Sequence, residues 1–194
     1  MKKKLKLIKL TYKPIEDTLT VKEKDGRFIA YYLTYDNCPE PPENDDDLFL
    51  VHYHRDCYVT YSPVVSREEA RQWWHGEKIP QEKQYWIFPL TSFIHGEVYF
   101  YLGNHFNPTG MAYGELDTSH CGAVFVSKAV WKRKKKAYEV ANGLVEKWNC
   151  YLTGDIYGVI VEEFDTQGKH IKRDECFGFY GYKYAMEELE AMMK

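Results

Sequence analysis

The stretch from Tyr113 to Glu163 constrains the fold of this 194-residue chain more than any other. Its centre, from about Lys128 to Cys150, carries apolar residues at alternating spacings of four and three, which share one face of a helix. These residues are Ala137, Ala141, Leu144, Trp148 and Tyr151. Ser127 is the expected N-cap, and Gly154 ends the helix.

Strand-forming segments rich in valine flank this helix, Gly122–Val126 before it and Asp155–Val161 after it. A strand–helix–strand unit of this length suits a right-handed parallel connection. An antiparallel strand inserted between the two is the alternative that the sequence leaves open.

The rest of the chain alternates strand and turn signals. Asp25-Gly26 predicts a hairpin between Thr18–Lys24 and Arg27–Tyr35. Further strands are expected where short apolar or alternating segments occur, at 4–12, 47–53, 85–93 and 97–102. Glycines at 178 and 181, among aromatic residues, predict a bulge or a close backbone approach.

Two shorter helices complete the expected set. Ser66 and Glu69 form a capping box that opens a helix over 66–76, and a C-terminal helix runs from about Tyr184 to Met193. The length suits one domain over residues 1–194. We therefore expect a single α+β domain with a mixed sheet and one long helix at about 128–150.

Composition limits the partners and the compartment. The net charge of −3 excludes a protein that binds nucleic acid with its whole surface, whereas 17 tyrosines are typical of recognition surfaces or of strands. An odd number of cysteines, five, without a C-x-x-C pair predicts reduced thiols in a cytoplasm. Lys6 and Lys9 interrupt any signal-peptide core, and no apolar run predicts a membrane span.

One candidate metal site lies at the end of the strand at 47–53. Alternation places His52, His54 and Asp56 on one strand face, and two imidazoles with a carboxylate can bind zinc or iron. The alternative is a strand whose outer face is polar and exposed to solvent. We predict no bound metal or cofactor, and keep a metal-dependent hydrolase or nuclease as an alternative function.

A second candidate site is the segment from Asp117 to Gly122, which contains Ser119 and His120. Such residues suggest a nucleophile and its base, but sequence neighbours are rarely oriented for that chemistry. Asp and Ser before Gly also form tight turns. A turn is the favoured interpretation.

The third candidate is Trp131 together with the basic segment at the start of the long helix, which consists of Lys132, Arg133, Lys134, Lys135 and Lys136. Five successive cations surround the helix, so i,i+4 partners cannot neutralise all of them. A phosphate backbone, an acidic protein surface, the chain's own Asp45–Asp47 or solvent alone would suit these charges.

Four islands occur in an order that resembles a family of small phage and prophage proteins. They are Leu50–Arg55, Leu116–Gly122, Tyr151–Val159 and Asp174–Gly181, within residues 36–181. His54 and Arg55 match the family pattern, whereas His52 and Asp56 depart from it. The resemblance implies a mobile-element accessory protein in a bacterial cytoplasm, and it supplies no catalytic residues.

These observations predict a non-enzymatic protein that binds a host macromolecule and inhibits a defence system such as CRISPR or restriction. The expected partner is a host protein or a protein–nucleic acid complex; direct nucleic-acid binding through Lys132–Lys136 is the alternative. Because ligands favour loops at strand ends, we also expect Arg55 to pair with Asp117 or Asp155 on one side of a sheet. The sequence does not fix the oligomeric state.

Overall fold

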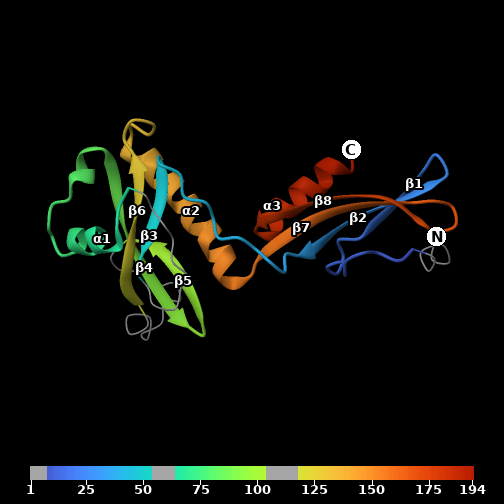
Figure 1. Ribbon diagram of the computed structural model, residues 1–194, viewed down its shortest axis with the longest axis horizontal. Coiled ribbons are helices and arrows are strands. Elements are labelled where there is room, and N and C mark those ends of the chain that lie inside the picture. The colour runs from blue at the N-terminus through green and yellow to red at the C-terminus, as the bar shows by residue number, and fades with distance from the viewer. Residues whose placement is uncertain (1–7, 54–63, 104–117) are drawn as a thin grey trace. The chain divides into compact units, whose positions relative to one another are not determined.

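The computed structural model describes residues 8–53, 64–103 and 118–194, and the chain divides into two compact units (Figure 1). The terminal unit comprises Met1–Glu40 and Gly154–Lys194, and the central unit comprises Pro41–Thr153. Each unit has its own four-stranded antiparallel sheet among these residues. The predicted α+β class is confirmed.

The sheet of the terminal unit has the strand order β1-β2-β7-β8. Its elements are β1 (Thr20–Lys24), β2 (Arg27–Tyr35), β7 (Ile156–Phe164), β8 (His170–Tyr180) and helix α3 (Tyr182–Met192). The predicted hairpin is confirmed: Asp25 and Gly26 both have positive φ, 51° and 72°, as a two-residue turn between twisted strands requires.

Strand alternation sends the apolar residues of the terminal unit to both faces of its sheet. On one face, Leu33 and Val159 are buried with Ala185 and Leu189 of α3. On the other face, a cluster around Tyr32, Ile160 and Phe164 is covered by the segment 8–12. Both faces are therefore cores, one beneath a helix and one beneath an extended segment.

The sheet of the central unit has the strand order β3-β6-β4-β5. Its elements are β3 (Leu48–His52), helix α1 (Arg67–Trp74), the 3-10 turn η2 (Pro80–Lys83), β4 (Tyr85–His95), β5 (Glu97–Leu102), β6 (Thr118–Ser127) and helix α2 (Lys134–Thr153). The capping box of Ser66 and Glu69 opens α1 as predicted.

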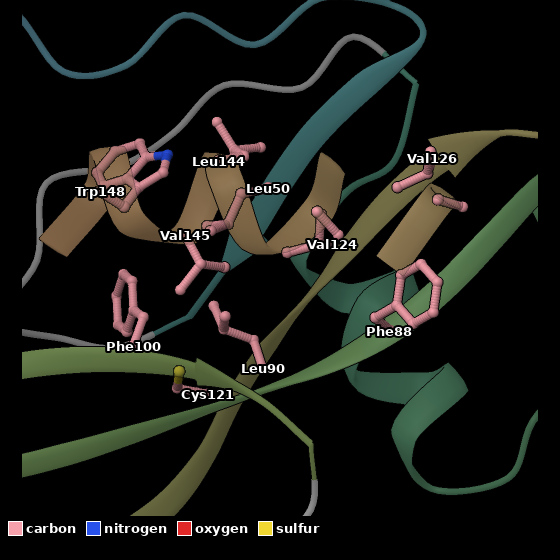
Figure 2. Packing of buried hydrophobic residues seen from close by; sticks show 12 residues of the cluster. Leu50, Phe88, Leu90, Phe100, Cys121, Val124, Val126, Leu144, Val145 and Trp148 are labelled. Atoms are coloured by element: carbon pink, nitrogen blue, oxygen red, sulfur yellow. The ribbon is translucent and has the colours of Figure 1, made fainter. Parts of the chain in front are cut away.

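The larger core of the central unit lies beneath α2 (Figure 2). Leu144, Val145 and Trp148 of the helix meet Leu90 and Phe100 of the sheet. The predicted apolar face of the helix is confirmed at Ala137, Ala141, Leu144 and Trp148, which are all buried. The opposite face of the sheet packs Phe49, Val51 and Phe125 near Ala70 of α1.

Gly122 allows β3 and β6 to approach closely. A Cβ atom at this position would lie 2.1 Å from the carbonyl oxygen of Val51 and 2.8 Å from the Cα of His52. The pairing of β4 with β6 shifts register between Leu90 and Thr91, opposite Gly122 and His120, so that Cys121 is the extra residue of a bulge.

The prediction of a mixed sheet is wrong. Strand β6 pairs with β3 and β4, whereas β7 pairs with β2 and β8, so α2 connects two sheets instead of two parallel strands. The helix packs on the sheet of the strand that precedes it, and the chain then continues into the other unit. The single-domain assignment stays a prediction, although the described cores belong to separate sheets.

The predicted N-cap of the long helix is also wrong. Helix α2 begins at Lys134, because the carbonyl oxygen of Ser127 accepts from the Trp131 N–H and closes a turn there. The C-terminal helix begins at Tyr182, close to the predicted start.

Residues 8–12 are not a strand, because side chains hold their backbone: Thr11 N–H donates to Glu162, and Tyr12 N–H donates to the Tyr32 hydroxyl. Strand β8 was not predicted as a strand, but the expected bulge is present. The β7–β8 register shifts where Gly158 lies opposite Phe177 and Gly178.

Candidate macromolecule-binding surface

The predicted site residues fall into three groups. His54, Arg55, Asp56 and Asp117 lie outside the described residues, and so does the expected pairing of Arg55 with an aspartate. Ser119 and the segment 131–136 belong to the central unit, and Asp155 belongs to the terminal unit.

The basic segment, Lys132–Lys136, lies at the start of α2 with every side chain exposed. Lys136 makes an ion pair with Glu139 at 2.6 Å. Within the described part of the chain, the side chains of 132–135 make no hydrogen bond or ion pair. None of these cations pairs there with Asp45–Asp47, and the Asp45 carboxylate accepts from backbone N–H groups of its own loop.

The helix dipole adds to the positive potential at this position. The first turn of α2 contains no acidic residue, although the N-terminus of a helix favours negative charge. Three lysines, Lys134 to Lys136, therefore stand where their charge opposes the dipole. An anionic partner would relieve both unfavourable interactions.

Trp131 anchors the basic segment to the core. Its side chain is partly buried against the cluster beneath α2, and its carbonyl oxygen accepts from the Trp86 indole N–H at 2.8 Å. The Lys128 ammonium lies 4.8 Å from the Trp86 ring centre and donates to the Glu82 carbonyl at 2.6 Å. Trp131 thus positions the cations, and its ring is not an exposed stacking surface.

Exposed apolar side chains flank the basic segment. Val130 is 53% exposed and Tyr138 is 45% exposed. Tyr138 lies one helical turn after Lys134, so the two share a side of α2. The Tyr138 ring packs edge-on against Phe88, with centroids 5.5 Å apart, which fixes it beside the cations. The fixed aromatic ring offers a surface for apolar or stacking contacts, and the neighbouring cations offer positive charge for an anionic group of the same partner.

Ser119 lies in β6, so the predicted turn is wrong from Thr118 onward. Its hydroxyl oxygen lies 3.1 Å from that of Ser92, and its carbonyl accepts from the Ser92 hydroxyl at 3.2 Å. The described partner of Ser119 is therefore another serine, and no described contact joins Ser119 to His120.

His120 is held in an aromatic cluster. The Trp74 ring stacks on the His120 ring, with the two ring centroids 3.6 Å apart. The Nδ1 atom of His120 contacts the Tyr53 hydroxyl, and the Arg71 guanidinium lies 5.0 Å from the centre of the Tyr53 ring. Burial lowers the pKa of His120 to about 4, and burial raises the pKa of Tyr53 to about 12. The imidazole is therefore neutral near pH 7.

His52 is fully buried. The centroid of its ring lies 5.5 Å from the Phe100 ring centroid and 5.8 Å from the Trp148 ring centroid. Its expected position on a solvent-facing strand surface is wrong, because α2 covers that face of β3. The residues described here contain no group of three histidine, cysteine, aspartate or glutamate side chains that could hold a metal. Since His54 and Asp56 lie outside them, the metal site stays a prediction.

Asp155 stabilises the start of β7. Its carboxylate accepts from the Tyr157 hydroxyl at 2.5 Å, and its carbonyl accepts from the Gly181 N–H at 2.9 Å. Burial, and then this carboxylate, raise the pKa of Tyr157. These contacts link β7 to the turn before α3.

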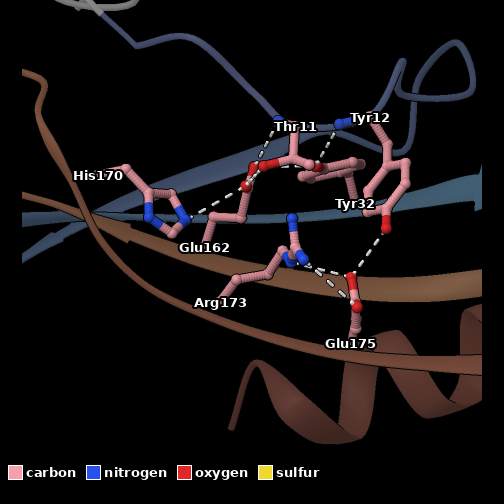
Figure 3. Close-up of polar contacts among 7 residues, drawn as sticks. All are labelled: Thr11, Tyr12, Tyr32, Glu162, His170, Arg173 and Glu175. Carbon is pink, nitrogen blue, oxygen red and sulfur yellow. Dashed lines mark hydrogen bonds and ion pairs between the residues drawn. The ribbon is translucent and has the colours of Figure 1, made fainter.

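The sequence interpretation missed a buried carboxylate, Glu162 (Figure 3). Its side chain is fully buried and accepts from the Thr11 N–H at 3.2 Å, the Thr11 hydroxyl and the Tyr32 hydroxyl at 2.8 Å, while His170 Nε2 lies 3.4 Å away. Burial raises the pKa of Tyr32. Strand alternation could have placed Glu162 inside, because it shares a face with Ile160 and Phe164.

A second polar group lies near Glu162 (Figure 3). Glu175 accepts from the Tyr12 hydroxyl at 3.0 Å and pairs with Arg173 at 2.9 Å, and the Arg173 guanidinium lies 5.5 Å from the Tyr12 ring centre. Both groups attach the segment 8–12 to its sheet, which indicates a structural role.

No protein-family model, curated protein sequence or solved structure matches this chain. Among the described residues, no helix combines the length and the apolar character needed to cross a membrane.

Proposed function

We propose that this chain is a non-enzymatic accessory protein of a phage or mobile element, which binds an anionic host macromolecule through the basic segment. The observation that carries the proposal is the set of four exposed cations, Lys132–Lys135, that lack ion-pair partners among the described residues. They stand at a helix start that Trp131 fixes to the core.

The partner in this proposal is a host protein, or a protein–nucleic acid complex, of a bacterial defence system such as CRISPR or restriction. The resemblance of the four islands to phage and prophage proteins supports that context. The segregation of charge supports an anionic partner: the net charge of −3 already includes the cations of the basic segment, so the rest of the chain is acidic and the positive charge is concentrated there.

Direct binding of nucleic acid is the second candidate, and Tyr138 favours it. Its exposed ring stands on the same side of α2 as Lys134, where a base could stack while the cations contact phosphates.

A phage-protection assay tests the first candidate. Expression of the parent protein in defended bacterial strains should raise phage plating, and replacement of Lys132–Lys135 by alanine should abolish the gain. A control variant replaces four exposed lysines elsewhere, at 13, 24, 169 and 183, and should keep it. Equal plating with and without the parent protein in every defended strain contradicts the proposal.

Fluorescence anisotropy with a short DNA duplex and a single strand separates the two candidates. Direct recognition predicts binding that weakens with salt, and removal of four phosphate contacts lowers the slope of log K against log salt by about 3–4. Absence of binding at 50 mM salt rejects the second candidate and leaves the first intact.

A further inference from the structure

Strand β8 forms a long exposed edge of the terminal unit's sheet. It has 11 residues, pairs with β7 on one side, and has no strand on its other side within the residues that the structure describes. As whole residues, His170–Gly178 are all exposed. An edge of this kind presents unpaired backbone N–H and C=O groups to other chains.

The edges of the central unit's sheet are protected by asparagine side chains. Asn149 accepts from the Phe100 N–H at 2.7 Å and donates to the Phe100 carbonyl at 2.9 Å, in the manner of a neighbouring strand. Asn44 makes the same pair of bonds with Leu50, at 2.9 Å and 3.2 Å. Among the described residues, no side chain makes such a pair of bonds with the backbone of Lys172–Cys176, the central part of β8.

The sequence of β8 is self-complementary around Asp174. The regular part of its pairing with β7 runs from Lys172 to Cys176, with a register shift at each end, so Asp174 is its centre. Arg173 and Glu175 flank this centre and share a face, as their 2.9 Å ion pair shows. Ile171, 47% exposed, and Phe177, 37% exposed, stand just outside them.

We propose that β8 pairs with β8 of a second copy of this chain, antiparallel, around a two-fold axis through Asp174. A two-fold axis perpendicular to the sheet leaves each side chain on its own face of the sheet. Because the axis passes through Asp174, residues at equal distances on either side of it become neighbours across the two strands. The partner's Glu175 therefore lies opposite Arg173, and the partner's Phe177 lies opposite Ile171. Symmetry repeats both pairs, which is the self-complementarity that an isologous interface requires. The two terminal units then share one continuous sheet.

The opposite face of the strand carries the unfavourable contact. There Asp174 lies opposite the partner's Asp174, and like charges directly opposite each other destabilise a strand pair. Lys172, 2.5 Å from Asp174 within the same chain, offsets part of this repulsion. Asp174→Asn should therefore tighten the dimer.

Sedimentation equilibrium with charge-reversed variants tests the pairing. The parent should be a concentration-dependent dimer, and Arg173→Glu alone or Glu175→Arg alone should be monomeric. An equimolar mixture of these two variants restores both cross-strand pairs and should dimerise again. If the single variants were monomeric only because each loses its own Arg173–Glu175 ion pair, mixing them would not restore the dimer. A monomeric parent, or a mixture that stays monomeric, overturns the proposal.

Disulfide trapping tests the register independently of the charges. Cys38 and Cys176 are exposed and are first replaced by serine. In that background, Asp174→Cys places two thiols on the axis and should give a covalent dimer under mild oxidation, at least tenfold faster than Lys172→Cys, whose thiols are offset along the strands. Equal rates, or faster cross-linking of Lys172→Cys, contradict pairing centred on Asp174.

Discussion

At the scale of single residues, two glycines of the central unit show which positions lack space for a side chain. A Cβ atom at Gly122 would overlap the backbone of β3, whereas a Cβ atom at Gly143, inside α2, would meet nothing within 4 Å. Backbone atoms in a sheet cannot move aside as a flexible side chain can. Sequence patterns alone do not distinguish these glycines.

Gly122→Ala should lower the free energy of unfolding by about 3 kcal/mol, because β3 and β6 must separate to admit the methyl group. Gly143→Ala should raise it by about 0.5–1 kcal/mol, because alanine is the better helix former and reduces the entropy of the unfolded chain. Urea denaturation of both variants measures the difference. Equal stability of the two would refute the close approach of β3 and β6.

Glu162 and its neighbour Glu163 form a second pair, for which we expect a large and a small loss of stability. Glu162→Ala leaves the buried Tyr32 hydroxyl and Thr11 without their acceptor, and should cost about 3 kcal/mol. Glu163→Ala removes a 3.3 Å ion pair between Glu163 and Arg27 near the surface, and should lower the free energy of unfolding by about 0.5 kcal/mol. Thermal unfolding of both variants tests this. A Glu162→Ala protein as stable as Glu163→Ala would contradict the buried network.

His120 makes stability depend on pH. Because burial depresses its pKa to about 4 from 6.5, the unfolded chain binds more protons between those values. The contribution of this residue is fully present above about pH 6.5 and is lost as pH falls towards 4.

His120→Gln should therefore show a smaller loss of stability than the parent across that window, measured by urea denaturation at several pH values. A slope for His120→Gln that matches the parent would show that the imidazole is not buried as described.

At the scale of elements, the sequence of α2 predicted which face of the helix is buried, but it did not predict that the helix begins at Lys134. The spacing of Ala137, Ala141, Leu144 and Trp148 follows helix geometry alone, so the core face was predictable. The start depends on the turn that Ser127 and Trp131 close and on the contact of Trp131 with Trp86, and no local pattern reveals such tertiary contacts.

The first turn of α2 allows stability and binding to be separated. Lys134→Glu should stabilise the protein by about 0.3–1 kcal/mol, because a negative charge suits the N-terminus of a helix, while partner binding should fall. Lys147 lies in α2 but outside its first and last turns, so Lys147→Glu should leave stability and binding close to those of the parent. Thermal unfolding and a binding assay on the same samples measure both. A Lys134→Glu protein that is less stable and binds as the parent does would contradict the charge argument.

At the scale of the whole molecule, strand positions were predictable but their partners were not. Alternation and turn residues located β1, β2, β4 and β5, because those signals are local. The division of the strands between two sheets depends on contacts between distant segments, such as β2 with β7. Likewise, the basic segment was visible in the sequence, whereas the burial of His52 behind α2 depends on tertiary packing.

The central claim is that the basic segment binds an anionic host macromolecule. Its most direct test is quantitative mass spectrometry of proteins captured from a nuclease-treated bacterial lysate by the parent, by the Lys132–Lys135 alanine variant, and by the control variant with alanine at 13, 24, 169 and 183. We expect at least one protein to be captured by the parent and by the control variant, and its amount to fall at least tenfold with the Lys132–Lys135 alanine variant. Capture of the same proteins in equal amounts by all three would contradict it.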